Sequence, residues 1–252
     1  MINNKFLTDE IEVLYEDENI LAINKPAGLI VHSDGRTEEP SVADWVIKNY
    51  PSLLDVGEPW VSPQGETILR PGIVHRLDRL TSGVLVIVKT KESHTFVKSQ
   101  FQNREVEKKY HSFVYGHPKD EKGIIDAEIG RTKKIPRRWT ALPGKTGNLR
   151  NAVTLWKVLK RGVDSSGGEK VSFLEAMPKT GRTHQIRVHF KFINHPVVCD
   201  KIYAPKKDCL LGLGRLALHA FQIKIKTPEG NFIKIEAPYP EDFQRALKIF
   251  DV

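Results

Sequence analysis

The chain has 252 residues, of which 40% are hydrophobic and 28% charged, a balance that excludes a disordered or collagen-like protein. Its longest uncharged apolar runs, such as Gly83 to Val88, are far shorter than the roughly 20 residues that span a bilayer. Acidic residues interrupt every apolar stretch near the first residue, so no secretory signal peptide is indicated.

The chain is basic, with 39 Lys and Arg against 31 Asp and Glu and a formal net charge of +8. Such an excess fits a polyanionic partner such as nucleic acid, but it also fits an ordinary basic protein. The only cysteines, Cys199 and Cys209, are too few for a disulfide scaffold or a four-ligand zinc site. We therefore expect a reduced, cytoplasmic protein without a metal site.

The first hundred residues alternate between strand and helix patterns. Two short strands are expected around a polar turn at 16–19, followed by a turn at Pro26-Ala27-Gly28. A helix is expected from Ser41, because Asp44 stands three residues after it as in a capping box. The remaining expectations here are a loop over 51–72, a buried strand over 83–90 and a helix over 91–103.

From Lys108 onward, strand-forming segments follow one another, separated by turn residues. They cover 108–116, 123–130, 152–162, 170–181, 216–228 and 231–240. Residues 183–194 could form a strand or a helix, and we favour a helix because the segment is too long for a typical isolated strand. A further helix is expected over 241–250. No internal repeat is visible. We predict an α+β fold: a leader over 1–10, then a single catalytic domain over 11–252 on a large mixed, mainly antiparallel sheet with flanking helices.

The stretch from Arg131 to Arg150 contains no acidic residue. Trp139 lies within it, where an aromatic ring could stack on a base. Prolines and glycines argue against regular structure here, so a solvated loop is the alternative to an RNA-binding surface. The cations of this basic stretch are Arg131, Lys133, Lys134, Arg137, Arg138, Lys145 and Arg150.

Two clusters could carry chemistry. In GIVHRLDRLTSGVLVIVKT (72–90), Asp78 is expected in a loop that enters a strand, with His75, Arg76 and Arg79 beside it. Neighbouring cations keep a carboxylate ionised, as a nucleophile or general base requires, although a surface salt bridge or turn cap is the plainer interpretation. In MPKTGRTHQIRVHF (177–190), cations and histidines gather near a helix start, but the histidine spacing is not that of a helical zinc motif.

Together these motifs resemble those of pseudouridine synthases of the RluA type. The resemblance rests on HRLDRLTSG and KTGRTHQIRVHF, with NHPVVCDKIY, LAINKPAGLIVH, REVEKKYHSFVYG, RLALHAFQIKIKTP and APYPEDF in the family's order, over 13–250. It implies an isomerase that converts specific uridines of rRNA or tRNA into pseudouridine. It further implies a central RNA-binding cleft and RNA as the partner, with no cofactor, S4 domain, membrane or obligate protein partner.

The resemblance also implies roles for single residues. Asp78 would be the nucleophile, and attack at the ribose C1′ or a glycal-type intermediate both remain open. Tyr110 would stack on the uracil and assist removal of the proton at C5, and Arg187 would pair with Asp78. The alternatives are a strand tyrosine that packs on the core and an arginine that binds phosphate. Arg76 would fill the space left by the flipped base. Lys25 and His75 would organise the site without reacting. His75 would also contact the RNA, and Lys25 could equally be structural.

Two other functions are compatible with parts of the sequence. An RNA-binding module that has lost catalysis is one, although Asp78, Tyr110 and Arg187 are all present. A glycoside hydrolase or nucleic-acid glycosylase is the other, and a hydrolase of this kind needs a second carboxylate near Asp78. Basic residues surround Asp78 locally, and release of free uracil would distinguish a glycosylase from an isomerase.

Overall fold

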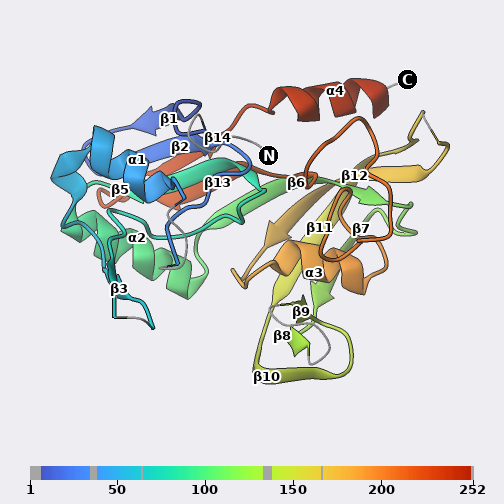
Figure 1. Cartoon of the computed structure of the whole chain (residues 1–252), viewed down its shortest axis with the longest axis horizontal. Coiled ribbons are helices and arrows are strands. Elements are labelled where there is room, and N and C mark those ends of the chain that lie inside the picture. Colours follow the sequence, from blue (N-terminus) through green and yellow to red (C-terminus); the bar gives the residue numbers. More distant parts are fainter. Residues whose placement is uncertain (1–6, 35–38, 64, 133–137, 166, 251–252) are drawn as a thin grey trace. The chain divides into compact units, whose positions relative to one another are not determined.

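The structure is a computed structural model that describes residues 7–34, 39–63, 65–132, 138–165 and 167–250. The chain divides into two compact units, Met1–Glu107 with Ala220–Pro238, and Lys108–His219 with Tyr239–Val252 (Figure 1). Each unit joins helices to antiparallel strand pairs, so the predicted α+β class with a mainly antiparallel sheet is confirmed. The leader, the single catalytic domain and the central cleft remain predictions.

The first unit contains a sheet in the order β1-β2-β5-β13, with β14 paired to β13. A separate pair, β3 with β4, lies in the segment expected to be a loop. The strands are β1 (Glu12–Glu16), β2 (Ile20–Lys25), β3 (Trp60–Val61), β4 (Thr67–Ile68), β5 (Ser82–Val88), β13 (Leu218–Lys226) and β14 (Phe232–Glu236). The helices are α1 (Val42–Asn49), the short 3₁₀ helix η2 (Pro51–Leu53) and α2 (Lys91–Asn103).

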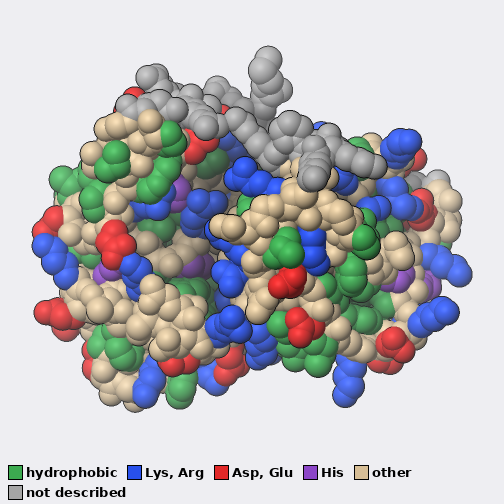
Figure 2. Space-filling view, turned by 90° about the horizontal axis from the view of Figure 1, so that it is seen from below, with side chains coloured by type: hydrophobic (Ala, Val, Ile, Leu, Met, Phe, Trp, Pro, Cys, Tyr) green, Lys and Arg blue, Asp and Glu red, His purple; other side chains and the backbone are tan. Residues whose placement is uncertain are grey.

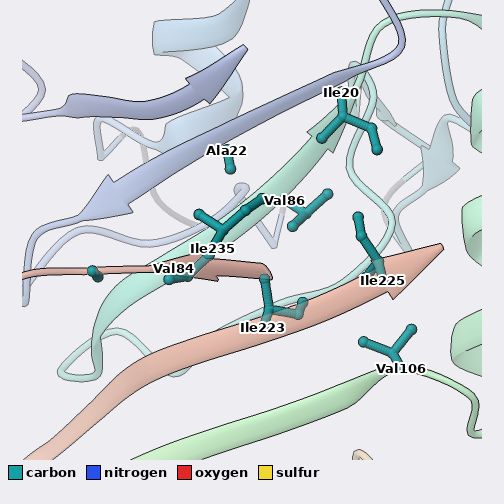
Figure 3. Close-up of a cluster of buried hydrophobic side chains, with 9 residues drawn as sticks. Ile20, Ala22, Val84, Val86, Val106, Ile223, Ile225 and Ile235 are labelled. Atoms are coloured by element: carbon teal, nitrogen blue, oxygen red, sulfur yellow. The ribbon is translucent and has the colours of Figure 1, made fainter. Parts of the chain in front are cut away.

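Aliphatic side chains on one face of this sheet form its core (Figure 3). Those on β2, β5 and β13 occupy alternate positions of their strands, because successive side chains of a strand point to opposite faces. The core residues are Ile20, Ala22, Val84, Val86, Val106, Ile223, Ile225, Ile235 and Ala237. Every residue of β5 is buried, which confirms the expected buried strand in front of which Asp78 lies.

The first helix begins as its sequence predicts. Ser41 Oγ accepts a hydrogen bond from the Asp44 amide at 3.3 Å, and the Asp44 carboxylate accepts one from the Ser41 amide at 2.9 Å. This reciprocal pair satisfies two backbone donors that the helix itself leaves unpaired. The predicted capping box is therefore confirmed, and α2 also matches its predicted span.

The second unit contains a sheet in the order β6-β12-β11-β7 and a smaller sheet in the order β10-β8-β9. Aromatic side chains of α4 pack on the β6–β12 pair, with the Phe243 ring 5.2 Å from that of Phe113. The elements are β6 (Glu107–Tyr115), β7 (Lys122–Asp126), β8 (Ile129–Thr132), β9 (Trp139–Thr140), β10 (Lys145–Arg150), β11 (Val153–Val163), β12 (Lys170–Pro178), α3 (Gln185–Phe192) and α4 (Glu241–Phe250).

Two expectations about this unit were wrong. Residues 123–130 form two strands in different sheets rather than one strand. In the part of the basic stretch that the structure describes, residues 145–150 are not irregular, because β10 pairs with β8, Lys145 opposite Thr132 and Thr146 opposite Arg131 (Figure 1). Gly147, with a φ of +76°, lies where the register of this pair shifts. A glycine of this kind marks an irregularity within paired strands rather than the absence of pairing.

The expected reduced state of the cysteines also differs from the structure. Cys199 and Cys209 form a disulfide, with their Cα atoms 4.5 Å apart. The sequence cannot reveal this pairing, because it depends on a turn that returns the chain over ten residues. Within the described residues, no helix is both long and apolar enough to cross a membrane.

Candidate active site

Asp78 lies half-buried in the loop directly before β5, as expected. Its carbonyl oxygen accepts a hydrogen bond from the Thr81 amide at 3.0 Å, which closes a turn. The side chain of the next residue, Arg79, forms an ion pair with Glu39 at 2.5 Å. The Arg79 carbonyl oxygen accepts a hydrogen bond from the Gly28 amide at 2.8 Å. The loop that carries Asp78 is thus bound to the turn at 26–28.

Lys25 strengthens this junction from inside the protein. Its side chain is fully buried, and Nζ donates to the carbonyl oxygens of Pro26 at 2.8 Å, Leu29 at 2.8 Å and Arg79 at 3.1 Å. A buried ammonium group is tolerated only when such acceptors replace water. Lys25 therefore holds the Lys-Pro turn against the Asp78 loop, a contact that suits a residue organising the site without reacting.

His75 anchors the other end of the loop. Its Nε2 accepts the Val86 amide of β5 at 2.9 Å, and its ring stacks on Phe101 of α2 with centroids 4.7 Å apart. Since a backbone N–H can only donate, this ring nitrogen carries no proton. His75 thereby ties the loop to both strand and helix, and its expected contact with RNA stays a prediction.

Cationic groups surround the loop on the protein surface. Arg76 is exposed, with Nη1 3.5 Å from Nε2 of His32, whose Nδ1 donates to the Ser33 carbonyl at 2.8 Å. Burial, together with the nearby guanidinium groups of Arg70 and Arg76, lowers the pKa of His32. Arg70 itself lies over the Trp60 ring at 5.1 Å. This side of the loop is therefore electropositive, as an RNA-binding surface requires.

In the second unit, Tyr110 lies half-buried on β6, opposite Ala176 of β12. Lys108, two residues earlier, shares its face, whereas His111 belongs to the face that packs on Tyr239. Burial, reinforced by the charge of Lys179, lowers the pKa of Lys108 to about 8. The face that carries Tyr110 thus also carries an amine that can lose its proton near neutral pH.

Gln185 has a structural role in the GRTHQIR motif, because its side-chain amide forms several internal hydrogen bonds. Its Nε2 donates to the Val153 carbonyl and to Thr154 Oγ1 of β11, each at 3.0 Å. Its Oε1 accepts from Thr180 Oγ1 at 2.6 Å and from the Arg182 amide at 3.0 Å. The side-chain amide is thus fully hydrogen-bonded, and it joins the start of α3 to β11.

The two histidines of the motif also have internal partners. His189 is fully buried, donates from Nε2 to the Ala127 carbonyl at 3.0 Å and has Nδ1 2.9 Å from Thr154 Oγ1. Burial lowers its pKa, so it is neutral at pH 7. His184 Nδ1 lies 2.9 Å from the Tyr203 hydroxyl. Among the residues that the structure describes, no group of three or more His, Cys, Asp and Glu could hold a metal ion.

Arg187 projects from α3 into a buried ion pair. Its Nε donates to Asp200 Oδ2 at 2.8 Å and its Nη2 to Asp200 Oδ1 at 2.9 Å, and its guanidinium lies 5.1 Å from the Tyr203 ring centroid. Asp200 belongs to the NHPVVCDKIY segment of the family resemblance, but nothing in the sequence marks it as the partner of Arg187. A guanidinium has donors for a second acceptor, so the expected pairing with Asp78 stays a prediction.

The basic stretch combines exposed charge with packed aromatic rings. Arg131 lies over Trp139, its partner across β8 and β9, at 5.4 Å, and Arg138 lies over Tyr203 at 5.4 Å. Trp139 also packs against a buried cluster that contains Ile129. Figure 2 shows Lys and Arg side chains recurring over the visible face of the molecule. Lys133, Lys134 and Arg137 lie outside the described residues.

Residues 19–192 match the family described as RNA pseudouridylate synthase. The chain belongs to this family. An uncharacterised RNA pseudouridine synthase of Synechocystis sp. is 36% identical over 94% of this chain and 68% of the relative. Ribosomal large subunit pseudouridine synthase D of Neisseria meningitidis serogroup B is 35% identical over 95% of this chain and 61% of the relative.

Two solved structures of pseudouridylate synthase domains are similar to this chain. Human RNA pseudouridylate synthase domain containing 4 is similar with a TM-score of 0.72 and 25% identity, covering 98% of this chain and 95% of that chain. Human RNA pseudouridylate synthase domain containing 1 also has a TM-score of 0.72 and 25% identity, covering 92% of this chain and 85% of that chain. The predicted family and the predicted isomerase activity on RNA are confirmed.

Proposed function

We propose that this pseudouridine synthase modifies uridines of large-subunit ribosomal RNA in the cytoplasm, with Asp78 as its nucleophile. The ribosomal target is supported by the names of relatives from Neisseria meningitidis and Zymomonas mobilis, both called ribosomal large subunit pseudouridine synthase D. The chain spans 61% and 72% of those two relatives. Transfer RNA is the alternative target.

The contacts of Lys25 and His75, which hold the loop of Asp78 in place, are the observation that carries the proposal. Lys25 is fully buried and donates to the Arg79 carbonyl at 3.1 Å, one residue from Asp78. His75 lies three residues before Asp78, and its ring accepts a hydrogen bond from the Val86 amide. A reactive group must be held by supporting contacts in a narrow range of positions, and a surface salt-bridging Asp needs no such support.

The proposed reaction is a balanced isomerisation. The bond between N1 of uracil and C1′ of ribose breaks, the base turns, a bond forms between C5 and C1′, and the proton on C5 is lost while N1 gains one. Asp78 would act on the sugar or its intermediate as an ionised carboxylate. No electrons are exchanged with a second molecule, so we expect the reaction to need no cofactor.

Tyr110 and Arg187 are proposed to serve the base and the carboxylate, respectively. A phenol ring can stack on uracil, and its oxygen can take part in proton transfer at C5. Lys108 shares the face of Tyr110, and with a pKa of about 8 it offers a second group for proton exchange. Arg187 would keep Asp78 ionised and correctly directed while Asp200 holds its guanidinium.

The proposal is tested by mapping pseudouridines in total RNA from cells with and without this protein. We expect specific pseudouridines of large-subunit rRNA to disappear in the deletion strain and to return with the parent gene. Loss confined to tRNA sites would assign the alternative target. Release of free uracil from RNA by the purified protein, without pseudouridine, would replace the isomerase with a glycosylase.

A further inference from the structure

A disulfide lies next to the residue that holds Arg187. Cys199 directly precedes Asp200 in the chain, and its partner Cys209 lies ten residues later. The span closed by this bond contains both Asp200 and Tyr203, the hydrogen-bonding and stacking partners of Arg187. The covalent link therefore restrains the segment that positions a residue assigned to the active site.

The two cysteines differ in accessibility. Cys199 is buried, with 6% of its surface exposed, whereas Cys209 is exposed. An attacking thiolate can thus approach Cys209 and has no comparable access to Cys199. Thiol–disulfide exchange requires such access to one of the two sulfurs. The disulfide is therefore placed where a small thiol can open it.

Hydrogen bonds to the side chains of Tyr115 and Asp164 hold the two cysteine segments in place without the bond. The Tyr115 hydroxyl accepts the Cys199 amide at 3.2 Å and donates to the Asp208 carbonyl at 2.5 Å, beside Cys209. The Leu211 amide is held by Asp164 at 2.8 Å. Reduction would consequently leave the sulfurs near each other, so that the bond can form again without a search by a long loop.

Cys199 also occupies an unusual backbone position. Its φ is +59°, in the left-handed region that favours glycine. A residue with a β-carbon adopts this conformation only at a cost in free energy. Such an outlier points to a function of the side chain, and the bond to Cys209 is the one that the structure shows.

We propose that Cys199 and Cys209 form a reversible redox site that takes small thiols such as glutathione and controls how firmly Asp200 holds Arg187. A glutathione thiolate attacks Cys209 Sγ, the S–S bond breaks, and Cys199 leaves as a thiolate that gains a proton. A second glutathione thiolate attacks the mixed disulfide, which releases Cys209 and forms glutathione disulfide. The reverse reaction reoxidises the pair. The effect on catalysis rests on the function proposed for Arg187.

The first experiment measures the redox state of the purified full chain. The protein is equilibrated in buffers of varied ratio of reduced to oxidised glutathione, the free thiols are alkylated, and the products are weighed by mass spectrometry. We expect interconversion between forms with two alkylated cysteines and with none. Two free thiols at every ratio, or a bond that no ratio opens, would overturn the proposal.

The second experiment compares the oxidised and reduced forms with the Cys209→Ser variant. We expect reduction to lower kcat at least about fivefold, the lower range of ordinary coupling between sites, with the KM for RNA changing less. Cys209→Ser should have the lower kcat in both buffers. Equal kcat values for the two redox forms of the parent would overturn the control of Arg187.

Amide hydrogen exchange separates this proposal from the proposed function. The Ile202 and Tyr203 amides both donate to Asp200 Oδ1 at 3.0 Å, so their exchange reports how firmly this turn is held. We expect faster exchange at both amides after reduction and in Cys209→Ser. This result in a protein inactive towards RNA would contradict the proposed function alone, whereas unchanged exchange would overturn the redox site's effect on Asp200.

Discussion

Arg187 and Asp200 form a bidentate ion pair inside the second unit, with 5% and 0% of their side chains exposed. Paired charges with matched donors and acceptors are tolerated in such a place, whereas a single charge is strongly unfavourable. Asp200 also accepts the amides of Ile202 and Tyr203. The carboxylate thus shapes a turn and fixes a guanidinium at the same time.

Replacing Arg187 should therefore affect stability as well as catalysis. We expect Arg187→Met to lose most activity and to lower the free energy of unfolding by about 3–5 kcal/mol, because Asp200 stays buried without its partner. Adding Asp200→Asn should recover part of the stability and none of the activity. Urea unfolding and single-turnover pseudouridine formation measure the two effects. A single variant as active as the parent would remove Arg187 from the site.

Lys25 should matter more than any exposed lysine. We expect Lys25→Met to lower the free energy of unfolding by about 2–4 kcal/mol, because the Pro26, Leu29 and Arg79 carbonyls lose a shared charged donor. The control is Lys91→Met, which breaks an exposed ion pair with Asp55 and should change the free energy of unfolding much less than Lys25→Met does. Equal effects of the two substitutions in urea unfolding would contradict the internal role of Lys25.

Local sequence signals predicted the elements that depend on local chemistry. The Ser41–Asp44 capping box and the apolar run of β5 each specify their structure within a few residues. The loop position of Asp78 followed from the same run. Where pairing decides the structure, local signals failed, as in the basic stretch, whose glycines suggested a loop although β10 pairs with β8.

The supporting contacts of the site could not be predicted for a related reason. Asp200 lies 13 residues from Arg187, and the Arg79 carbonyl lies 54 residues from Lys25. Both separations reach beyond a single helix or strand, and side-chain periodicity acts only within one element, so no pattern marks these pairs. The family resemblance identified which residues recur in the motifs, and the structure gives physical reasons for Lys25, Gln185 and His189.

Stability should decrease in mild acid because of buried neutral histidines. Burial lowers the pKa of His189 below its ordinary value of 6.5, which it regains in the unfolded chain. The unfolded state therefore binds more protons as the pH falls below about 6.5, and the free energy of unfolding decreases. Urea unfolding at pH 7, 6 and 5 should show this decrease, with a smaller slope in His189→Leu. An identical slope in that variant would assign the effect to other groups.

Asp78→Asn should abolish pseudouridine formation while RNA affinity stays within a few fold. The amide keeps the size of the side chain but lacks the charge that a nucleophile needs. Asp55→Asn is the matched control, because Asp55 is exposed and pairs with Lys91. Its turnover should equal that of the parent protein. Substantial turnover by purified Asp78→Asn would exclude Asp78 as the nucleophile.

The basic stretch should account for part of the salt dependence of RNA binding. If Lys133, Lys134, Arg137 and Arg138 each neutralise a phosphate, their joint replacement by Ala should flatten the slope of log K against log salt by roughly 2.8, at about 0.7 per contact on single strands. Turnover at saturating RNA should fall much less than RNA affinity, because none of the four residues is assigned to the chemical step. The control replaces four exposed lysines elsewhere: Lys91, Lys119, Lys122 and Lys234. A slope that changes equally in both variants, or in neither, would show that RNA binds through another surface.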